Sequence, residues 1–408
     1  VGKTVRYTPL EDRDTRTEAI ASLSTNLQSG AVKTLVLFDV DPVYNAPADL
    51  KFADALSKVE EVVFVGTHGN QTSASKNCSW VVPGSHYLEA WGDARGFEGT
   101  LGIVQPMIYP LVDRSQGGRS ALELTAMMSG ENTVDGLQIV RETAQKRYET
   151  SEFAFERQWR NALADGFEPG TAWPLQNARA VSADVVTAAV KDAMSSGAGT
   201  DDIELVLHHD GKVFDGRFGN VGWMQELPDP VSKLTWDNAL MMGPVLAQRL
   251  GLKSGDMVKV TGSAGTIPAA AMVMPGYAEN TCSLSIGYGQ GATSGRIADG
   301  AGFNAYPLRT SKAMNLVRKV SIASAAGTYP LATTQDHGTI GSLIPEVPEA
   351  GIQERLPSLV RGASLDTYRK NPAFSKGAAH IAHSLSLWEE SNLDGAKFRW
   401  AMSINLST

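Results

Sequence analysis

Cysteine is scarce in this sequence, with only Cys78 and Cys282 among 408 residues. Two thiols cannot by themselves hold an iron–sulfur cluster or a tetrahedral zinc ion, because both need more ligands than two. A single disulfide stays open on counting alone. Both cysteines border strand-like apolar runs, where buried free thiols are the commoner arrangement. The sequence therefore excludes a thiolate-held metal centre built from this chain alone.

Long apolar runs and a surplus of basic residues are also missing. A membrane helix needs about 20 consecutive apolar residues, whereas the smoothest run here, Ile267–Met274, has the length of a strand. Lys and Arg number 36 against 44 Asp and Glu, which gives a net charge of -8. Binding to phosphate backbones requires clustered positive charge. We therefore expect no direct membrane span and no nucleic-acid partner.

Glycine, by contrast, is abundant. The chain has 40 glycines, about a tenth of its residues against a usual figure of about 7%. This excess predicts many turns and argues against an all-helical fold. The first residue is Val1, and no basic segment followed by an apolar one comes after it. We therefore expect a processed product or a segment of a longer protein.

The first part of the chain has the pattern of an α/β fold. Thr34–Phe38, Glu61–Val65 and Ser79–Val82 are continuous apolar runs, as in strands buried within a parallel sheet. Helical spacing at Glu18–Leu27 and Asp49–Ser57 places helices around them. Alternation of this kind predicts a doubly wound parallel-sheet domain. We also expect one turn of helix at Gln71–Lys76, a long helix over Val134–Ala164 and a shorter one over Ala183–Ser195.

After about residue 200 the pattern changes to short strands separated by glycines. It predicts a small β-barrel with strands at Ile203–His208, Met257–Thr261, Thr266–Met274 and Cys282–Ile286, a helix at Gly243–Leu250 and a hairpin turn at Asp210-Gly211. From Thr334 onward the chain is loop-rich, as a linker or wrapping arm would be. The predicted domains are residues 1–200, 201–333 and 334–408.

The candidate binding site lies in two loops that follow the first two predicted strands. Ligands of open α/β sheets bind beyond the carboxyl ends of the strands. The polar and glycine residues there suit a nucleotide or cofactor tail, although the same residue types favour turns without any ligand. They are Asp39, Asp41, Tyr44, Asn45, Gly66, Thr67, His68, Asn70 and Gln71.

Other groups of residues give weaker indications. Gly287–Gly302 is rich in glycine but lacks the flanking strand and helix of a dinucleotide fingerprint, so a loop on a barrel rim is expected. His208 and His209 are adjacent on a strand and face opposite sides, which disfavours a shared metal. His380 and His383 lack a clear third ligand beyond Glu389 or Glu390, and Ser85-His86 with Asp93 lacks the nucleophile elbow of a hydrolase.

The segment His86–Asp93 carries two acids, Glu89 and Asp93. A pair of carboxyl groups can carry out acid–base chemistry. The preferred interpretation is structural, with the carboxylates capping a helix or anchoring a loop.

Taken in order, several motifs resemble the C-terminal half of the molybdopterin oxidoreductase large subunits. They are Asp41–Pro47 (DPVYNAP) after the first strand, Glu61–Pro83 around the second and third strands, Gly243–Val260 (GPVLAQRLGLKSGDMVKV), Gly265–Gly276 and Gly300–Leu308. The resemblance covers most of Lys33–Ser324. It implies a barrel of the double-psi type and adds Asn304 to the candidate site residues.

A narrower resemblance is to the cofactor-less molybdopterin-like iron–sulfur subunit of alternative complex III, a quinol-oxidising respiratory complex. It rests on His86–Asp93 (HYLEAWGD), Asn220–Pro230 (NVGWMQELPDP), Lys233–Asn238 (KLTWDN) and Trp400–Ser407 (WAMSINLS). The last motif is similar to the strand that, in this group, precedes a ferredoxin-like region. Where catalytic relatives carry an acidic loop, this chain has Thr67–Thr72 (THGNQT).

The resemblance implies a structural segment that scaffolds an adjoining iron–sulfur region. On this hypothesis the chain holds no cofactor, Asp39–Pro47 and Thr67–Gln71 are relics of a pterin site, and its partners are a multihaem cytochrome and a quinol-oxidising membrane subunit. Kinship implies a peripheral location on the periplasmic face of the bacterial cytoplasmic membrane. Two alternatives stay open, namely part of a catalytic large subunit that binds molybdopterin dinucleotide, and a plain nucleotide-binding module.

Overall fold

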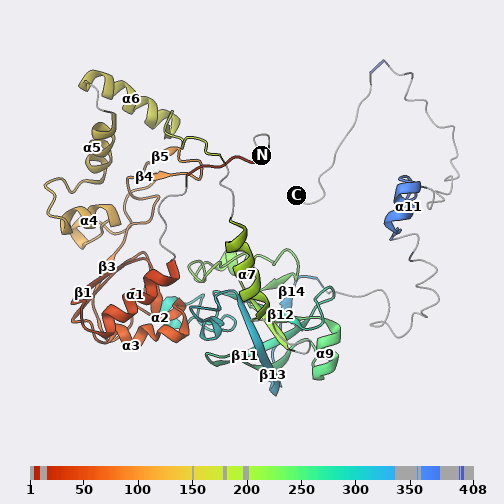
Figure 1. Cartoon of the computed structure of the whole chain (residues 1–408). Helices are drawn as coiled ribbons and strands as arrows, with labels where there is room; N and C mark the ends of the chain where they lie inside the picture. The colour runs from red at the N-terminus through yellow and green to blue at the C-terminus, as the bar shows by residue number, and fades with distance from the viewer. Residues whose placement is uncertain are drawn as a thin grey trace. The chain divides into compact units, whose positions relative to one another are not determined.

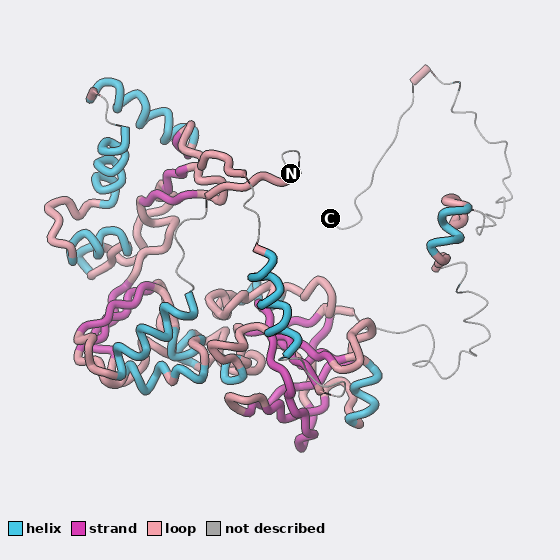
Figure 2. The backbone as a smooth tube through the Cα atoms, viewed as in Figure 1, coloured by secondary structure: helices cyan, strands magenta, loops and turns pink. Residues whose placement is uncertain are grey.

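A computed structural model describes residues 4–9, 16–148, 151–177, 182–195, 202–335, 356, 360–376, 395 and 397–398. The chain divides into two compact units, Val1–His337 and Gly338–Thr408. Figures 1 and 2 show the helices and strands of the first unit, which holds both the parallel sheet and the barrel. The three predicted domain boundaries stay predictions.

The first part of this unit is a parallel sheet with helices around it. Its strands β1 (Thr34–Phe38), β2 (Glu61–Gly66) and β3 (Cys78–Pro83) are parallel neighbours in chain order. The elements around them are α1 (Arg16–Gln28), α2 (Pro42–Asn45), η1 (Ala48–Leu50) and α3 (Phe52–Leu56). Leu27 of α1, Leu56 of α3 and Phe64 of β2 share one buried core, because the apolar runs of the strands need a helical cover. Residues 71–76 form turns in place of the expected helical turn.

A second part of this unit combines a small antiparallel sheet with helices. The sheet is made of β4 (Gly92–Arg95), β5 (Leu101–Val104) and β6 (Phe167–Glu168). It was not predicted, because these strands have four residues or fewer. The helices and turns are η2 (Arg114–Gln116), α4 (Ala121–Met128), α5 (Gly136–Tyr148) and α6 (Glu152–Asp165). Helix α7 (Ala183–Ser195) comes next in the chain, before the barrel strands.

The single helix predicted over Val134–Ala164 is wrong, because α5 and α6 are separate helices. Ser151 adopts an extended backbone directly before α6, and serine is favoured at this cap position. The apolar period continues on both sides of the break, since Val140 and Phe155 belong to one core. The apolar periodicity therefore gave no sign of the break between α5 and α6.

The second half of the unit is a closed β-barrel of six strands in the order β10-β11-β9-β12-β7-β13. The strands are β7 (Ile203–His209), β9 (Leu240–Met242), β10 (Asp256–Thr261), β11 (Thr266–Val273), β12 (Thr281–Ile286) and β13 (Leu316–Thr328). Shorter elements are α8 (Gly222–Glu226), β8 (Leu234–Thr235), α9 (Pro244–Leu250), η3 (Ala292–Ser294), η4 (Tyr306–Leu308) and β14 (Ala332–Thr333). The predicted combination of a parallel-sheet α/β part and a β-barrel is confirmed.

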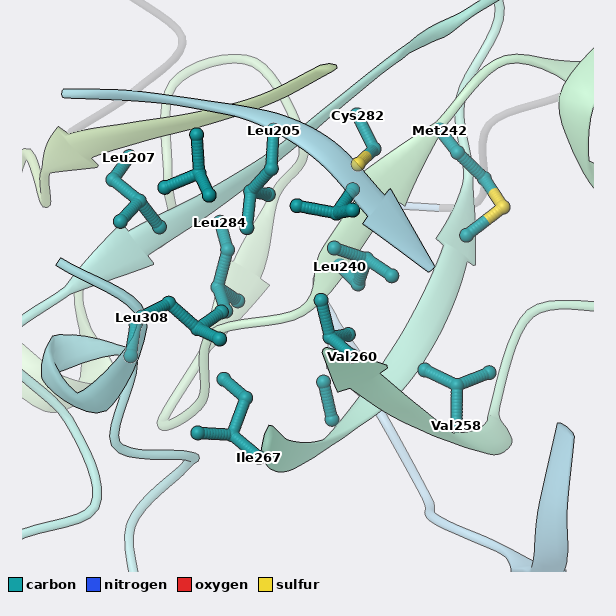
Figure 3. Packing of buried hydrophobic residues seen from close by; sticks show 14 of the residues in the cluster. Leu205, Leu207, Leu240, Met242, Val258, Val260, Ile267, Cys282, Leu284 and Leu308 are labelled. Carbon is teal, nitrogen blue, oxygen red and sulfur yellow. The ribbon is translucent and has the colours of Figure 1, made fainter. Parts of the chain in front are cut away.

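Inward-facing apolar side chains fill the barrel (Figure 3). Leu205, Leu240 and Leu284 come from three different strands and are fully buried together. Cys282 lies in the same cluster as a free thiol, and burial raises its pKa to about 12. The expectation of buried free thiols is confirmed for Cys282, which serves as a small apolar side chain, whereas Cys78 is free but only half-buried.

The hairpin expected at Asp210-Gly211 is reduced to a turn closed by a single antiparallel bridge between Asp210 and Phe214. The barrel neighbours of β7 are β12, which is parallel to it, and β13, which is antiparallel. The Asp210 carboxylate accepts hydrogen bonds from the backbone of Lys212 (2.8 Å) and Val213 (3.0 Å). The side chain of Asp210 thus closes a turn, as predicted, but a loop follows the turn in place of the second strand of a hairpin.

In the second unit, the described residues include α11 (Leu365–Lys370), whose first turn is capped by the Ser364 hydroxyl. His380, His383, Glu389, Glu390 and most of the predicted arm 334–408 lie outside the described residues. Across the portion that is described, no helix combines the length and apolarity needed to traverse a bilayer.

Candidate functional site

The two loops predicted to form the site are joined to each other. The Asp41 carboxylate accepts hydrogen bonds from the Thr72 hydroxyl (2.6 Å), the Thr72 backbone (2.9 Å) and the Gln71 backbone (3.1 Å). The Thr72 hydroxyl in turn accepts from the backbone of Val43 (3.1 Å). Loop Asp39–Pro47 is thereby fixed against loop Gly66–Thr72 at the carboxyl ends of β1 and β2.

Burial raises the pKa of Asp41 above its ordinary value, although the hydrogen bonds from Thr72 and Gln71 act in the opposite direction. A carboxylate that is desolvated despite three hydrogen-bond donors lies in a well-enclosed place between the two loops. Because its oxygens already accept hydrogen bonds from within the protein, the main role of Asp41 is to hold the two loops together.

Tyr44 connects the α/β part to the barrel. Its side chain is buried, its hydroxyl donates to the Tyr288 carbonyl (2.7 Å), and its ring meets that of Tyr306 edge-on at 4.7 Å. It therefore belongs to the barrel core. The sequence placed Tyr44 among the ligand-facing residues, yet it mainly fills the contact between the two parts.

A cavity of about 190 Å³ lies between these loops and the barrel. From the barrel side come Gly216 and Gln290, and the Gln290 amide donates to the Gly216 carbonyl (2.7 Å). Gly216 has a φ of +105°, and a Cβ there would stand 2.3 Å from the Gln290 amide nitrogen. The close approach of the backbone therefore requires glycine. The full lining is Asp39, Val40, Asp41, Tyr44, Asn45, Thr67, His68, Gly69, Asn70, Asp215, Gly216, Arg217, Asn220, Val221, Gln290 and Ser294.

The ten predicted site residues are distributed unevenly around this cavity. Those that line it are Asp39, Asp41, Tyr44, Asn45, Thr67, His68 and Asn70. Gln71 reaches it only through its backbone bond to Asp41. Gly66 lies at the end of β2, and Asn304 packs against Gly289, at which a Cβ would stand 2.2 Å from the Asn304 backbone nitrogen. Neither of these two lines the cavity.

Residues of the barrel side that sequence analysis missed set the charge of the cavity. Arg217 donates from Nε (2.9 Å) and Nη2 (2.7 Å) to the two oxygens of Asp215. Burial alone would raise the pKa of Asp215, but these hydrogen bonds and the guanidinium charge outweigh it and lower the pKa. Both residues lie in an irregular loop after β7, so no periodic signal marks them. The Gly-rich loop Gly287–Gly302, correctly expected at the barrel rim, contributes Gln290 and Ser294.

A diphosphate-bearing dinucleotide fits this cavity poorly. Three carboxylates, of Asp39, Asp41 and Asp215, line it against one guanidinium, and that guanidinium is already paired. Phosphate sites normally offer free basic side chains or open helix N-termini. The volume of about 190 Å³ is also below the roughly 300–1,000 Å³ of pockets that enclose larger ligands.

The His86–Asp93 segment has the structural role that was preferred for it. The buried Glu89 carboxylate accepts from the backbone of His86 (3.2 Å) and Leu111 (2.8 Å). Asp93 pairs with Arg147 at 3.3 Å. Neither acid lines the cavity, and Glu89 anchors a loop as expected. Nowhere in the described ranges do three or more His, Cys, Asp or Glu side chains form a group suited to a metal ion.

A second cavity, also of about 190 Å³, surrounds the buried Lys212, and its lining includes His208, His209, Asp210 and Gly211, none of which was predicted to line a cavity. The Lys212 ammonium donates to the Leu234 carbonyl (3.0 Å), and burial lowers its pKa despite the nearby Asp210, Asp229 and Asp237. Each of these carboxylates accepts bonds from neighbouring residues. These groups form a polar network around the cavity.

Comparison with known proteins identifies the barrel half. Residues 224–332 match the family model described as "Molydopterin dinucleotide binding domain". None of the curated proteins matches the chain. Among solved structures, it is similar to acetylene hydratase from Pelobacter acetylenicus, with 14% identity and a TM-score of 0.44 over 73% of this chain. The chain covers 46% of that protein, so it spans about half of its length. A molybdopterin dinucleotide-binding type of domain is thus present in residues 224–332.

Proposed function

We propose that this chain is a molybdopterin-oxidoreductase-like segment whose dinucleotide site has degenerated and whose role is structural. It scaffolds an adjoining iron–sulfur region within a quinol-oxidising respiratory complex of the alternative complex III type. The domain match at residues 224–332 supports the kinship. The motifs His86–Asp93, Asn220–Pro230 and Lys233–Asn238 support the narrower assignment.

The observation that carries the proposal is the charge of the cavity. Three carboxylates face a single guanidinium that Asp215 already neutralises. Carboxylates close to a diphosphate make its binding less favourable by like-charge repulsion. A site under selection to hold a dinucleotide would carry the opposite balance of charge.

The partners in this proposal are a multihaem cytochrome and a quinol-oxidising membrane subunit, and the location is the periplasmic face of the cytoplasmic membrane. Iron–sulfur clusters would be bound by an adjoining region and not by this chain, whose two cysteines lie apart as free thiols. These assignments rest on the motif resemblance.

The test is elemental analysis of the intact complex isolated from its own cells. We expect iron, with molybdenum and tungsten far below one atom per copy of this chain, and no fluorescent oxidised pterin after heat release. Stoichiometric molybdenum or tungsten on this subunit would overturn the proposal.

The second candidate is part of a catalytic large subunit that binds molybdopterin dinucleotide, which the match at residues 224–332 favours. The cofactor would supply the redox chemistry. The residues that would contact it are Asp39, Asp41, Asn45, Gly66, Thr67, His68, Gln71 and Asn304. Tight binding of a guanine dinucleotide by the full chain, lost in Asp39→Ala, would favour this candidate over the structural one.

A further inference from the structure

The second cavity contains a buried charge with unused hydrogen-bonding capacity. Lys212 lines this cavity and is only 3% exposed. An ammonium group carries three N–H donors. Among the described residues only one acceptor meets them, the Leu234 carbonyl at 3.0 Å. The ring of Tyr288 lies 5.7 Å from the ammonium nitrogen and offers only its π face. Two N–H groups of a buried charge therefore lack an acceptor from the protein, which is costly unless something else supplies one.

Two carboxylates that line the same cavity each have an unused acceptor oxygen. Asp229 Oδ1 accepts from the backbone (2.6 Å) and the hydroxyl (2.8 Å) of Ser232. Asp237 Oδ1 accepts from the backbone of Gly302 (2.9 Å) and from the Tyr329 hydroxyl (2.7 Å). Within the part of the chain that the structure describes, every hydrogen bond to these two carboxylates ends on Oδ1. Oδ2 of each carboxylate is thus available to a ligand.

The cavity can be reached from solvent and has the volume of a small molecule. His208 and His209 belong to its lining, and both are exposed. Its volume of about 190 Å³ gives room for roughly six water molecules at about 30 Å³ each. The third carboxylate, of Asp210, uses both oxygens, because it accepts from the Lys212 backbone (2.8 Å) and the Ser285 hydroxyl (3.1 Å). The unused polar groups are therefore those of Lys212, Asp229 and Asp237.

The charges and the unused groups together indicate the chemical class of the ligand. The carboxylates of Asp210, Asp229 and Asp237 outnumber the single ammonium, so an anion is repelled. A cation without an acceptor atom would leave the N–H groups of Lys212 unsatisfied and would add a second positive charge beside them. A hydroxyl group both donates and accepts. A neutral molecule with neighbouring hydroxyl groups can therefore accept from the ammonium and donate to the carboxylates at the same time.

We propose that this cavity binds a small neutral polyol, whose hydroxyl groups are held between Lys212, Asp229 and Asp237. The Lys212 ammonium donates to ligand oxygens, and Oδ2 of each aspartate accepts from a ligand hydroxyl. The second cavity shares no lining residue with the first one. The inference therefore does not depend on the proposed structural function, and either can fail without the other.

The test uses glycerol as the probe, titrated into the purified full chain in a buffer free of other polyols. Saturation-transfer difference NMR measures the binding. We expect glycerol to bind saturably. Three compounds should bind at least about tenfold more weakly, since each loses one or more charge-assisted hydrogen bonds or meets a like charge. They are ethylene glycol dimethyl ether, which has no hydroxyl hydrogen, the anion glycerol phosphate, and the cation methylammonium, which has no acceptor.

Variants locate the binding in the second cavity. Asp229→Asn replaces the Oδ2 acceptor by an amide donor of nearly the same shape, and Lys212→Met removes the ammonium. Asp299→Asn is the matched control, because this carboxylate is exposed on the barrel-rim loop and does not line the cavity. We expect each cavity variant to weaken glycerol binding about tenfold or more, and the control to leave it unchanged. Melting temperatures show which chains are folded, and Asp229→Asn alone decides the matter if Lys212→Met does not fold.

Three results would overturn the inference. The first is a wild-type signal that does not saturate, as expected if the cavity takes up only water. The second is equal glycerol affinity of the folded Asp229→Asn and Asp299→Asn chains. The third is binding of the dimethyl ether, glycerol phosphate or methylammonium that is as tight as that of glycerol.

Discussion

At the scale of single residues, Asp41 shows how much of the site could be predicted. The rule that ligands bind at the carboxyl ends of parallel strands selected its loop, and the structure places that loop at a cavity. The directions of the side chains were harder to predict from sequence. Tyr44 packs into the barrel core, and Asp41 accepts a hydrogen bond from Thr72. Both outcomes depend on chain segments far away in sequence. Asp215 and Arg217 gave no local signal at all.

Asp41→Asn should destabilise the protein by about 1–3 kcal/mol, because the Gln71 amide then loses its acceptor. Asp54→Asn is the control, since this carboxylate is exposed on α3. Urea unfolding at neutral pH measures both changes. Equal midpoints for the two variants would contradict the fastening role of Asp41.

The same variant should change the dependence of stability on pH. Burial raises the pKa of Asp41 in the folded state. The stability that Asp41 contributes is therefore fully present below its pKa in the unfolded chain, 3.8, and is lost as the pH rises through its pKa in the folded state. The stability difference between wild type and Asp41→Asn should therefore be larger at acid pH than at neutral pH. A difference that shrinks on acidification would show that the pKa is lowered instead.

At the scale of elements, continuous apolar runs were reliable guides. β1, β2, β11 and β12 lie close to their predicted positions. β9 was missed because it has three residues, and β13 because its sequence mixes polar and small residues (LVRKVSIASAAGT). β13 also carries a register shift between Arg318 and Val320. Tertiary pairing, which no local pattern reveals, created both strands.

The register shift in β13 centres on Lys319, which has a φ of +59°. Glycine accepts this conformation without strain, whereas a β-branched side chain does not. Lys319→Gly should leave stability nearly unchanged, and Lys319→Val should lower it by about 1–2 kcal/mol. Thermal melts of both variants decide the matter. A valine variant as stable as the glycine variant would argue against the bulge.

At the scale of the whole molecule, the two-part architecture was predictable and the way its parts join was not. Alternating helices and strands followed by glycine-separated strands indicated a sheet and then a barrel. The contact between them depends on side chains such as Tyr44 and on the backbone bond from Ala48 to Arg309 (2.9 Å). Such pairings over long sequence separations have no signature in one sequence.

Tyr44→Ala should therefore uncouple the α/β part from the barrel. The lost ring leaves a cavity that costs about 3–5 kcal/mol, and we expect two separate unfolding transitions in place of one. Tyr44→Phe should lose only the bond to Tyr288 and keep a single transition. The exposed Tyr109→Ala serves as control with an unchanged midpoint. Urea titration followed by both fluorescence and circular dichroism tests this, and coincident curves for Tyr44→Ala would contradict it.

The buried thiol of Cys282 can report how often the barrel opens. Cys282 is fully buried, and its pKa of about 12 leaves almost no thiolate at neutral pH. Alkylating reagents react with thiolates, so they reach this sulfur only when the strands part. The rate at which Cys282 is alkylated thus counts barrel openings, and the half-buried Cys78 provides the internal reference.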